Sequence, residues 1–249
     1  MYSHGLMKDS IYRKFFEKAK DPMLAILIDP DKYSPEMPLI LSQKSNMPDF
    51  VLVGGSHVSA STDECIIDIR QKTGLPVLLF PGNPSQLSIH ADAVLMLMLL
   101  SGRNPEYLIG HHVASAPLIK KYNTETISTG YILVGNHTES SVCKVSRTVP
   151  ISSDETEKII ATSLAGEIIG NKIIYLEAGS GAEQSLDTAI ISEVKKNISV
   201  TLFSGGGIKS AAVASSHWKA GADVVVVGTA FENDPGIVRK LVVARDTLR

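Results

Sequence analysis

Short runs of valine, isoleucine and leucine recur along the whole chain, and this repetition constrains the fold more than any other feature. Most runs are continuous rather than alternating, which is typical of parallel strands that are covered on both faces. The predicted strands are Leu24–Asp29, Phe50–Gly54, Val77–Phe80, Ala93–Met98, Thr126–Val134, Ile173–Glu177, Val200–Ser204 and Val224–Gly228.

Helical patterns separate most of these strands, because apolar residues recur there at three- and four-residue spacing. The predicted helices are Thr62–Lys72, Pro105–Lys121, Asp154–Ile169, Ala182–Lys195, Ile208–Ala220 and Pro235–Arg245. A further helix is expected over Ser10–Lys20, before the first strand. Strand–helix repetition without a break in composition predicts one α/β domain over residues 1–249, and a length of 249 residues matches a (β/α)8 TIM barrel.

One strand–helix unit is incomplete. The connection from Pro81 to Asp92 holds two prolines and a glycine, which leave room for one helical turn at most. A parallel crossover normally needs about a dozen residues, most of them helix. We therefore expect a modified barrel in which helix 3 is replaced by a short connection. That connection either opens an apolar channel beside the third and fourth strands or is trimmed without a functional role.

Glycines follow three strands near the end of the chain, in the segments 175–181 (YLEAGSG), 203–207 (FSGGG) and 224–229 (VVVVGT). Without a Cβ atom the backbone can approach a ligand closely, and N–H groups at the start of a helix attract anions. The loops after the last two strands of a (β/α)8 barrel are a frequent phosphate site. The sequence therefore predicts a phosphorylated substrate.

Polar residues end the first two predicted strands, where the catalytic groups of this fold lie. Asp29 and Asp31 follow the first strand, and carboxylates suit Mg²⁺, which favours one or two of them together with substrate phosphates. The alternative is a solvated Asp-Pro turn. Ser56 follows the second strand, and its hydroxyl either reaches a metal or a phosphate or belongs to a tight turn.

Glu177 lies between a predicted strand and a glycine loop, beside the expected phosphate site. A carboxylate there is suited to bond a hydroxyl of the same substrate and to accept its proton. Tyr175 points to the same side of the strand, because side chains alternate along it. The alternative is structural: a core tyrosine with a satisfied hydroxyl, and a glutamate paired to a neighbouring base.

Composition argues against several functional classes. A formal net charge of −2 gives no reason to expect a nucleic-acid partner. Cys65 and Cys143 form neither a metal-binding nor a redox motif, as expected of reduced thiols in a cytoplasmic protein. The start, Met1–Gly5, lacks the basic and apolar regions of a signal peptide, and the longest apolar stretch, Ala93–Leu100, is too short to span a bilayer.

Taken in order, the strand-end segments resemble the geranylgeranylglyceryl phosphate synthase family, including its bacterial heptaprenyl relatives. The resemblance covers nearly the whole chain, and its opening is similar to that of archaeal and Bacteroidetes-type members. Members of the Bacillus type carry a lysine where this chain has Leu27. The segments that carry the resemblance are 27–32 (LIDPDK), 53–56 (VGGS), 80–83 (FPGN), 101–105 (SGRNP), 108–110 (LIG), 175–181 (YLEAGSG), 204–208 (SGGGI) and 227–229 (VGT).

The resemblance implies a prenyltransferase of lipid biosynthesis on a modified TIM barrel that lacks helix 3. Family members join the C3 hydroxyl of sn-glycerol 1-phosphate to a polyprenyl diphosphate, here expected to be geranylgeranyl diphosphate, and release pyrophosphate with the help of Mg²⁺. Carried over by residue, Asp29 and Ser56 would hold Mg²⁺, and Glu177 would be catalytic. The residues expected to bind glycerol 1-phosphate are Tyr175, Leu176, Glu177, Ala178, Gly179, Ser180, Gly181, Gly206, Gly207, Gly228 and Thr229.

The resemblance also implies a homo-oligomer, either a dimer or a hexamer, with no transmembrane segment and with peripheral membrane contact for product release. Because side chains fill a barrel of this kind, we expect the prenyl tail to leave through the gap at the short connection, with the helix from Pro105 as one wall. Two alternatives stay open. One is another phosphate-binding barrel, such as an isomerase or a cyclase, and the other is a non-catalytic barrel that binds a phosphometabolite.

Overall fold

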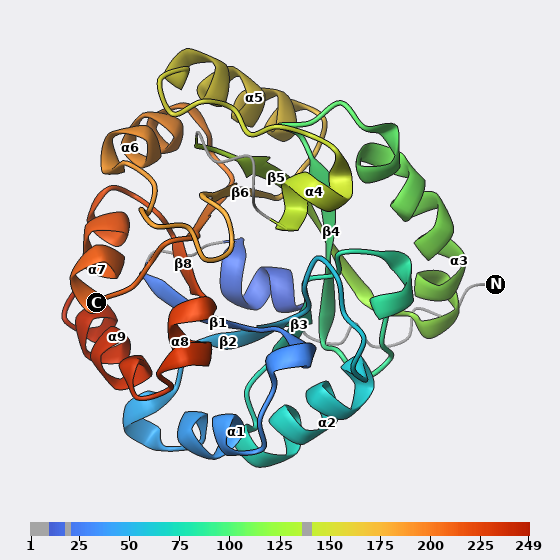
Figure 1. Cartoon of the computed structure of the whole chain (residues 1–249), viewed down its shortest axis with the longest axis vertical. Coiled ribbons are helices and arrows are strands. Elements are labelled where there is room, and N and C mark those ends of the chain that lie inside the picture. Colours follow the sequence, from blue (N-terminus) through green and yellow to red (C-terminus); the bar gives the residue numbers. More distant parts are fainter. Residues whose placement is uncertain (1–9, 18–20, 136–140) are drawn as a thin grey trace.

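The computed structural model describes residues 10–17, 21–135 and 141–249. These residues form eight parallel strands, each bonded to the next along the chain, and β8 is bonded back to β1, which closes the barrel (Figure 1). The predicted fold class is confirmed, and every predicted strand is present. The strands are β1 Met23–Ile28, β2 Phe50–Val53, β3 Val77–Leu79, β4 Ala93–Leu99, β5 Glu125–Leu133, β6 Ile173–Glu177, β7 Thr201–Gly205 and β8 Val224–Val227.

Helices surround the barrel, as Figure 1 shows. A π-helical turn over Glu106–Gly110 leads directly into α3, so the predicted helix from Pro105 is present. The helices are α1 Glu36–Leu41, α2 Thr62–Thr73, α3 His111–Tyr122, α4 Ser141–Ser146, α5 Thr156–Ile168, α6 Thr188–Asn197, α7 Ala211–Lys219, α8 Thr229–Asn233 and α9 Ile237–Asp246.

Two helices begin three or more residues later than the sequence pattern predicts, and a capping side chain explains each difference. The carboxylate of Asp187 accepts the Ala189 N–H at 2.8 Å, so α6 begins after Asp187 rather than at Ala182. The Ser210 hydroxyl accepts a backbone N–H at the start of α7 in the same way. Such caps satisfy N–H groups that have no partner within the helix. The residues ahead of each cap stay in the loops that follow β6 and β7.

The segment before β1 closes the N-terminal end of the barrel. It forms a π-helical turn over Tyr12–Phe16, while residues 18–20 of the predicted helix lie outside the described residues. The Phe16 ring packs against Phe50 and Phe203, with both pairs of ring centroids 5.5 Å apart. Its carbonyl accepts the Thr201 hydroxyl at 3.1 Å. This segment therefore plugs the barrel from below.

The helix that follows the third strand in a regular (β/α)8 barrel is absent here; the helix labelled α3 follows β4. Within the described stretch between β3 and β4, the backbone makes a single 3₁₀ turn over Pro84–Gln86. The buried Gln86 side chain donates to the Gly55 carbonyl at 2.8 Å and accepts the Gly82 N–H at 3.2 Å. Gly82 packs so closely that a Cβ atom there would stand 2.3 Å from the Gly55 oxygen. The short connection is therefore held against the loop after β2, and in this described stretch no α-helix lies between α2 and α3 on the outside of the barrel.

Aromatic rings fill the interior of the barrel. They form a continuous series from Phe16 through Phe203 and Tyr175 to Phe80 and Tyr131, with centroids 5.2 to 5.8 Å apart. A second, mainly aliphatic layer lies between the strands and the helices. The axis of the barrel has no room for a long ligand, as is usual in this fold. Among the described residues, none of the helices has the length and apolar character needed to cross a bilayer.

Candidate functional site

Asp29 follows β1 at the C-terminal end of the barrel. Its Oδ1 atom accepts the Asp31 N–H at 3.1 Å and caps a 3₁₀ turn over Pro30–Lys32. The carboxylate lies against Gly55, where a Cβ atom would stand 3.0 Å from Oδ2. Partial burial is the main cause that raises the pKa of Asp29. No donor in the described part of the chain bonds Oδ2, so this oxygen is available to a ligand.

Asp31 has a different role from Asp29. Its exposed carboxylate accepts the N–H groups of Ser59 and Ala60, at distances of 2.6 to 3.1 Å. The hydrogen bonds from the Ala60 and Ser59 N–H groups lower the pKa of Asp31, and the bond from Ala60 has the larger effect. Because its oxygens hold the loop after β2 in place, Asp31 has a structural role that Asp29 does not share.

Glu232 of α8 connects the last loop of the barrel to the first. Its Oε2 atom forms an ion pair with Lys32 at 2.9 Å, and its Oε1 atom accepts the Asp29 N–H at 3.3 Å. The hydrogen bond to Glu232 is the main cause that raises the pKa of Lys32. The backbone that carries Asp29 is therefore held from two sides, and a cation lies beside it.

Glu177 ends β6 and is almost fully buried, with 6% of its surface exposed. Its Oε1 atom accepts the Gly179 N–H at 2.8 Å. Burial raises the pKa of Glu177 to about 7, against the opposing effects of the Tyr175 hydroxyl and the Gly179 N–H. The carboxyl group is therefore poised to exchange a proton near neutral pH.

Tyr175 lies below Glu177 on the same side of β6, as the alternation predicts. Its hydroxyl lowers the pKa of Glu177, yet it forms no hydrogen bond of normal geometry with any described residue. Both groups face Gly205, where a Cβ atom would stand 2.4 Å from the Tyr175 hydroxyl and 2.9 Å from Glu177 Oε2. The missing Cβ makes room for the two polar groups, and the Tyr175 hydroxyl lies beside Glu177, shielded from solvent.

The glycine loops after β6, β7 and β8 converge beside Glu177. Gly206 has a φ of +82°, and a Cβ atom there would stand 2.3 Å from Glu177 Oε1. Ser180 and Thr229 bring two of the loops together, since their hydroxyl oxygens lie 3.5 Å apart. Gly228 begins α8 and has ordinary space at its Cβ position, where the nearest atom is 3.5 Å away. The three loops therefore lie together beside Glu177, where the sequence predicts the phosphate site.

Some of the expected binding residues have structural tasks in these loops. Gly207 has a φ of +66°, and a Cβ atom there would stand 2.3 Å from the Gln184 carbonyl oxygen, so the loop after β6 folds directly over it. The Ala178 N–H donates to the Gly205 carbonyl at 3.0 Å. The Leu176 side chain is fully buried in the layer between barrel and helices.

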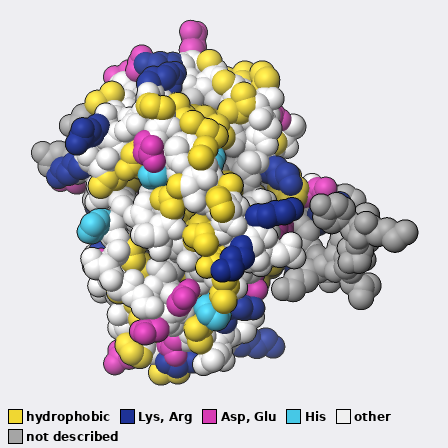
Figure 2. Space-filling view, turned by 90° about the vertical axis from the view of Figure 1, so that its right-hand side faces the viewer, with side chains coloured by type: hydrophobic (Ala, Val, Ile, Leu, Met, Phe, Trp, Pro, Cys, Tyr) yellow, Lys and Arg dark blue, Asp and Glu magenta, His cyan; other side chains and the backbone are white. Residues whose placement is uncertain are grey.

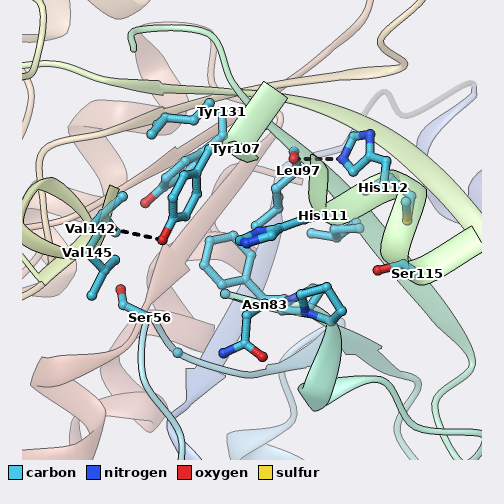
Figure 3. Close-up of a pocket in the computed structure, with 18 of the residues that line it drawn as sticks. Ser56, Asn83, Leu97, Tyr107, His111, His112, Ser115, Tyr131, Val142 and Val145 are labelled. Carbon is cyan, nitrogen blue, oxygen red and sulfur yellow. Dashed lines mark hydrogen bonds between the residues drawn. The ribbon is translucent and has the colours of Figure 1, made fainter. Parts of the chain in front are cut away.

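An apolar groove opens at the short connection after β3, where a regular barrel has a helix. One wall is the short connection after β3, and the other is the segment Glu106–Gly110 with α3. Figure 3 shows Ser56 and Asn83 at one side of this groove, with Tyr107 and His111 across it. The expected groove with the helix from Pro105 as one wall is confirmed. Its apolar lining includes Phe80, Leu87, Leu95, Met96, Leu97, Leu99, Tyr131, Val142 and Val145.

The groove and the glycine loops meet inside the rim of the barrel. Tyr131 lines the groove, and its ring packs edge-on against Tyr175 at 5.2 Å. Tyr175 in turn faces Glu177 and Gly205. Ser56 lines the groove and directly follows Gly55, against which the Asp29 carboxylate lies. The predicted site residues are thus distributed around one continuous site.

The donor atoms near Asp29 fit a magnesium ion that substrate helps to hold. The described residues contain no cluster of three or more histidine, cysteine or acidic side chains arranged for a metal. Asp29 offers one unbonded carboxylate oxygen, and Ser56 follows the glycine that the carboxylate touches. Mg²⁺ commonly binds through one or two carboxylates and takes its other oxygens from phosphates and water. Such a set suits a magnesium diphosphate better than a lone ion.

Gln86 and Glu232 are two site residues that the sequence reasoning misses. Each is a single polar residue in an irregular segment or a short helix, so no periodic pattern marks it. One signal could have identified Gln86: it is a polar residue inside a connection too short for a helix. An amide side chain that is buried in such a connection must form hydrogen bonds with backbone groups. Glu232 carries no comparable signal.

The comparisons with known proteins agree with this geometry. The family model described as the PcrB family matches residues 17–245. The chain is similar to geranylgeranylglyceryl phosphate synthase of Flavobacterium johnsoniae, with 45% identity over 90% of this chain and 95% of the relative. The enzyme of that name from Chitinophaga pinensis is 42% identical over 94% of this chain and 95% of its own length.

A solved structure shows the same similarity in three dimensions. It is the crystal structure of (S)-3-O-geranylgeranylglyceryl phosphate synthase from Thermoplasma acidophilum in complex with substrate sn-glycerol-1-phosphate. The two chains superpose with a TM-score of 0.84 and 30% identity, over 92% of this chain and 94% of the other.

Proposed function

The chain belongs to the PcrB family, and from this membership and the site geometry we propose that it transfers a polyprenyl group to the C3 hydroxyl of sn-glycerol 1-phosphate. The expected donor is geranylgeranyl diphosphate, and the products are an ether-linked prenylglyceryl phosphate and pyrophosphate. One observation carries the proposal. An apolar groove ends at Tyr131, which packs on Tyr175 beside a buried carboxyl group and the glycine loops. An apolar donor and a phosphorylated acceptor can therefore meet at one rim.

At the acceptor side, Glu177 orients the reacting hydroxyl and accepts its proton as the ether bond forms. Its pKa of about 7 leaves a substantial ionised fraction at neutral pH. The unpartnered Tyr175 hydroxyl is placed to bond the same glycerol. The phosphate would lie beside the backbone around Gly206 and beside Gly228 and Thr229. Backbone N–H groups of these loops would stabilise its negative charge.

At the donor side, Asp29 and Ser56 would hold Mg²⁺ together with the diphosphate. When bound, the ion would stabilise the charge that accumulates on the departing pyrophosphate. Lys32 also lies on this rim, where its charge is balanced by Glu232 at 2.9 Å. The prenyl tail would lie in the groove, where each buried methylene contributes about 0.8 kcal/mol of hydrophobic transfer. We also propose a cytoplasmic dimer or hexamer, which rests on the family resemblance.

A direct assay tests the proposal. The chain is incubated with sn-glycerol 1-phosphate, radiolabelled geranylgeranyl diphosphate and Mg²⁺, and the product is extracted into organic solvent. We expect labelled prenylglyceryl phosphate of the corresponding mass, and little with the sn-glycerol 3-phosphate enantiomer. An isomerase, a cyclase or a simple binding barrel would leave the prenyl diphosphate intact. Intact diphosphate with every prenyl length tested would overturn the proposal.

A further inference from the structure

One wall of the groove is α3, and the outer side of this helix is apolar although little of the helix is buried against the barrel. In α3, which is described throughout, only Ser115 is buried. Ile109 and Val113 expose 56% and 66% of their surfaces, and the exposed Pro117 follows at the same four-residue spacing. Residues spaced by four lie on one flank of a helix. A contiguous apolar flank in water usually marks a surface that contacts something else.

Further apolar side chains extend this surface, which we call the α3 face and define as Ile109, Val113, Pro117, Leu118 and Tyr122. Leu118 and Tyr122 expose 38% and 37% of their surfaces. Figure 2 shows this side of the molecule, where hydrophobic side chains gather in a band with charged side chains of both signs around it. The inner side of the same helix lines the groove, through His111, His112 and Ser115. The α3 face therefore lies directly outside the apolar groove.

The charged residues of the segment that carries the α3 face are mostly positive. Residues 101–124 contain Arg103, Lys120 and Lys121 against a single acidic residue, Glu106, in a chain whose net charge is −2. Within the described residues, none of these three cations forms an ion pair. An apolar flank bordered by unpaired cations is typical of a helix that lies on an anionic lipid surface.

We propose that the α3 face docks on the surface of an anionic membrane, so that a prenyl tail passes between the bilayer and the groove without crossing water. This inference rests on the function proposed above, because only a long apolar substrate or product needs such a route. The charges favour a lipid surface over a second copy of the chain. A symmetric pair would place the same cations of both copies against each other, which costs free energy.

Vesicle binding tests the proposal with the full chain. We expect co-sedimentation with vesicles of phosphatidylglycerol and phosphatidylcholine, weakened by added salt and by omission of phosphatidylglycerol. The double variant Ile109→Asp/Val113→Asp should bind at least tenfold more weakly, and Lys120→Glu/Lys121→Glu should lose the salt dependence. A matched control is Ile168→Asp/Ile169→Asp at the end of α5, where the exposed fractions are 81% and 60%. This control should bind as the wild type does.

Two further measurements separate this proposal from its alternatives. The double variant Ile109→Asp/Val113→Asp should keep the melting temperature of the wild type, which shows that it is folded, and the wild type should turn over the soluble short-chain donor geranyl diphosphate without vesicles. If neither protein turns over any prenyl donor, the proposed function fails, whatever the vesicles show. Equal vesicle binding by wild type and double variant would overturn the docking proposal. So would a double variant whose only change is a smaller assembly mass in sedimentation velocity, because the α3 face would then be a contact between copies.

Discussion

Glu177 is the residue whose environment gives the most specific expectation. Its pKa is raised to about 7 by burial, and the unprotonated carboxylate is the form that accepts a proton. The value of kcat/KM for sn-glycerol 1-phosphate should therefore rise with pH and level off above about 7. Glu177→Gln should lower turnover by about 10²- to 10⁴-fold, the usual range for a lost general base. A pH–rate profile at saturating prenyl diphosphate checks both, and an unchanged midpoint in the variant would exclude this role.

Asp29 and Asp31 offer a matched pair of charge removals. Asp29→Asn keeps the shape of the side chain that lies on Gly55 but removes its charge, so magnesium-dependent turnover should fall by roughly 10²-fold or more. Asp31→Asn weakens only the bonds to Ser59 and Ala60 and should leave the magnesium requirement unchanged. Titration of activity with Mg²⁺ compares the two. A similar loss in both variants would show that the loop, rather than a metal ligand, is responsible.

Gly228 and Gly207 should respond differently to an added methyl group. At Gly228 the new Cβ would meet its nearest neighbour at 3.5 Å, so Gly228→Ala should fold and raise the KM for sn-glycerol 1-phosphate, with little effect on that for the prenyl donor. At Gly207 the Cβ would stand 2.3 Å from the Gln184 oxygen, with φ at +66°, so Gly207→Ala should lower the melting temperature. Steady-state kinetics measure the KM values of Gly228→Ala, and thermal melts measure the stability of Gly207→Ala. Equal KM changes for both substrates in Gly228→Ala would contradict the phosphate assignment.

At the scale of secondary-structure elements, His217 connects α7 to β7 directly behind the glycine loop. Its Nδ1 atom lies 2.8 Å from the Ser204 hydroxyl, and burial lowers the pKa of His217 to about 4. The folded protein keeps this histidine neutral, whereas the unfolded chain binds a proton below its ordinary pKa of about 6.5. The contribution to stability is therefore complete above that pH and is lost as the pH falls toward 4.

Urea unfolding at pH 7 and pH 4.5 measures this loss. The His217 contribution to the free energy of unfolding should be smaller at the lower pH by roughly 2 to 3 kcal/mol. His217→Gln should be less stable at pH 7 but should show a smaller difference between the two pH values. The same pH difference in wild type and variant would show that His217 is not the group that titrates.

Element types could be read from the sequence more reliably than element boundaries. Continuous apolar runs predict all of the strands, and the prolines after Phe80 predict the missing helix. The short helix α1 is not predicted, because prolines at 35 and 38 mask its pattern. The start of α6 is predicted too early, because residues after Ala182 have helical spacing but pack over Gly207, a tertiary contact that local pattern does not contain.

In the candidate site, too, some features could be predicted from the sequence and others could not. Glycine and carboxylate positions at strand ends predict Asp29 and Glu177, since parallel strands bring their ends to one rim. The sequence does not distinguish Asp31 from Asp29, because the difference lies in the loop that each carboxylate faces. It also does not predict that Gly207 is needed for packing, or that Gln86 fastens the short connection to Gly55. These facts depend on distances between loops that are far apart in sequence.

At the scale of the whole molecule, the barrel provides two unlike surfaces around one rim. The loops after β6, β7 and β8 are rich in glycine and polar groups, whereas the side between β3 and α3 is apolar. The ring series from Phe16 to Tyr131 fills the space between them. The donor and acceptor can therefore enter from different directions, the acceptor from above the rim and the tail from the side.

The link between Asp29 and Glu232 also bears on how the protein is made. These residues are 203 positions apart, and β1 completes its pairing only when β8 has been added. During synthesis at about 5 to 20 residues per second, the first strand must wait several seconds or more for its last partner. A nascent chain cannot assemble the rim around Asp29 before the segment with Glu232 has left the ribosome, so activity begins only after that segment has been made.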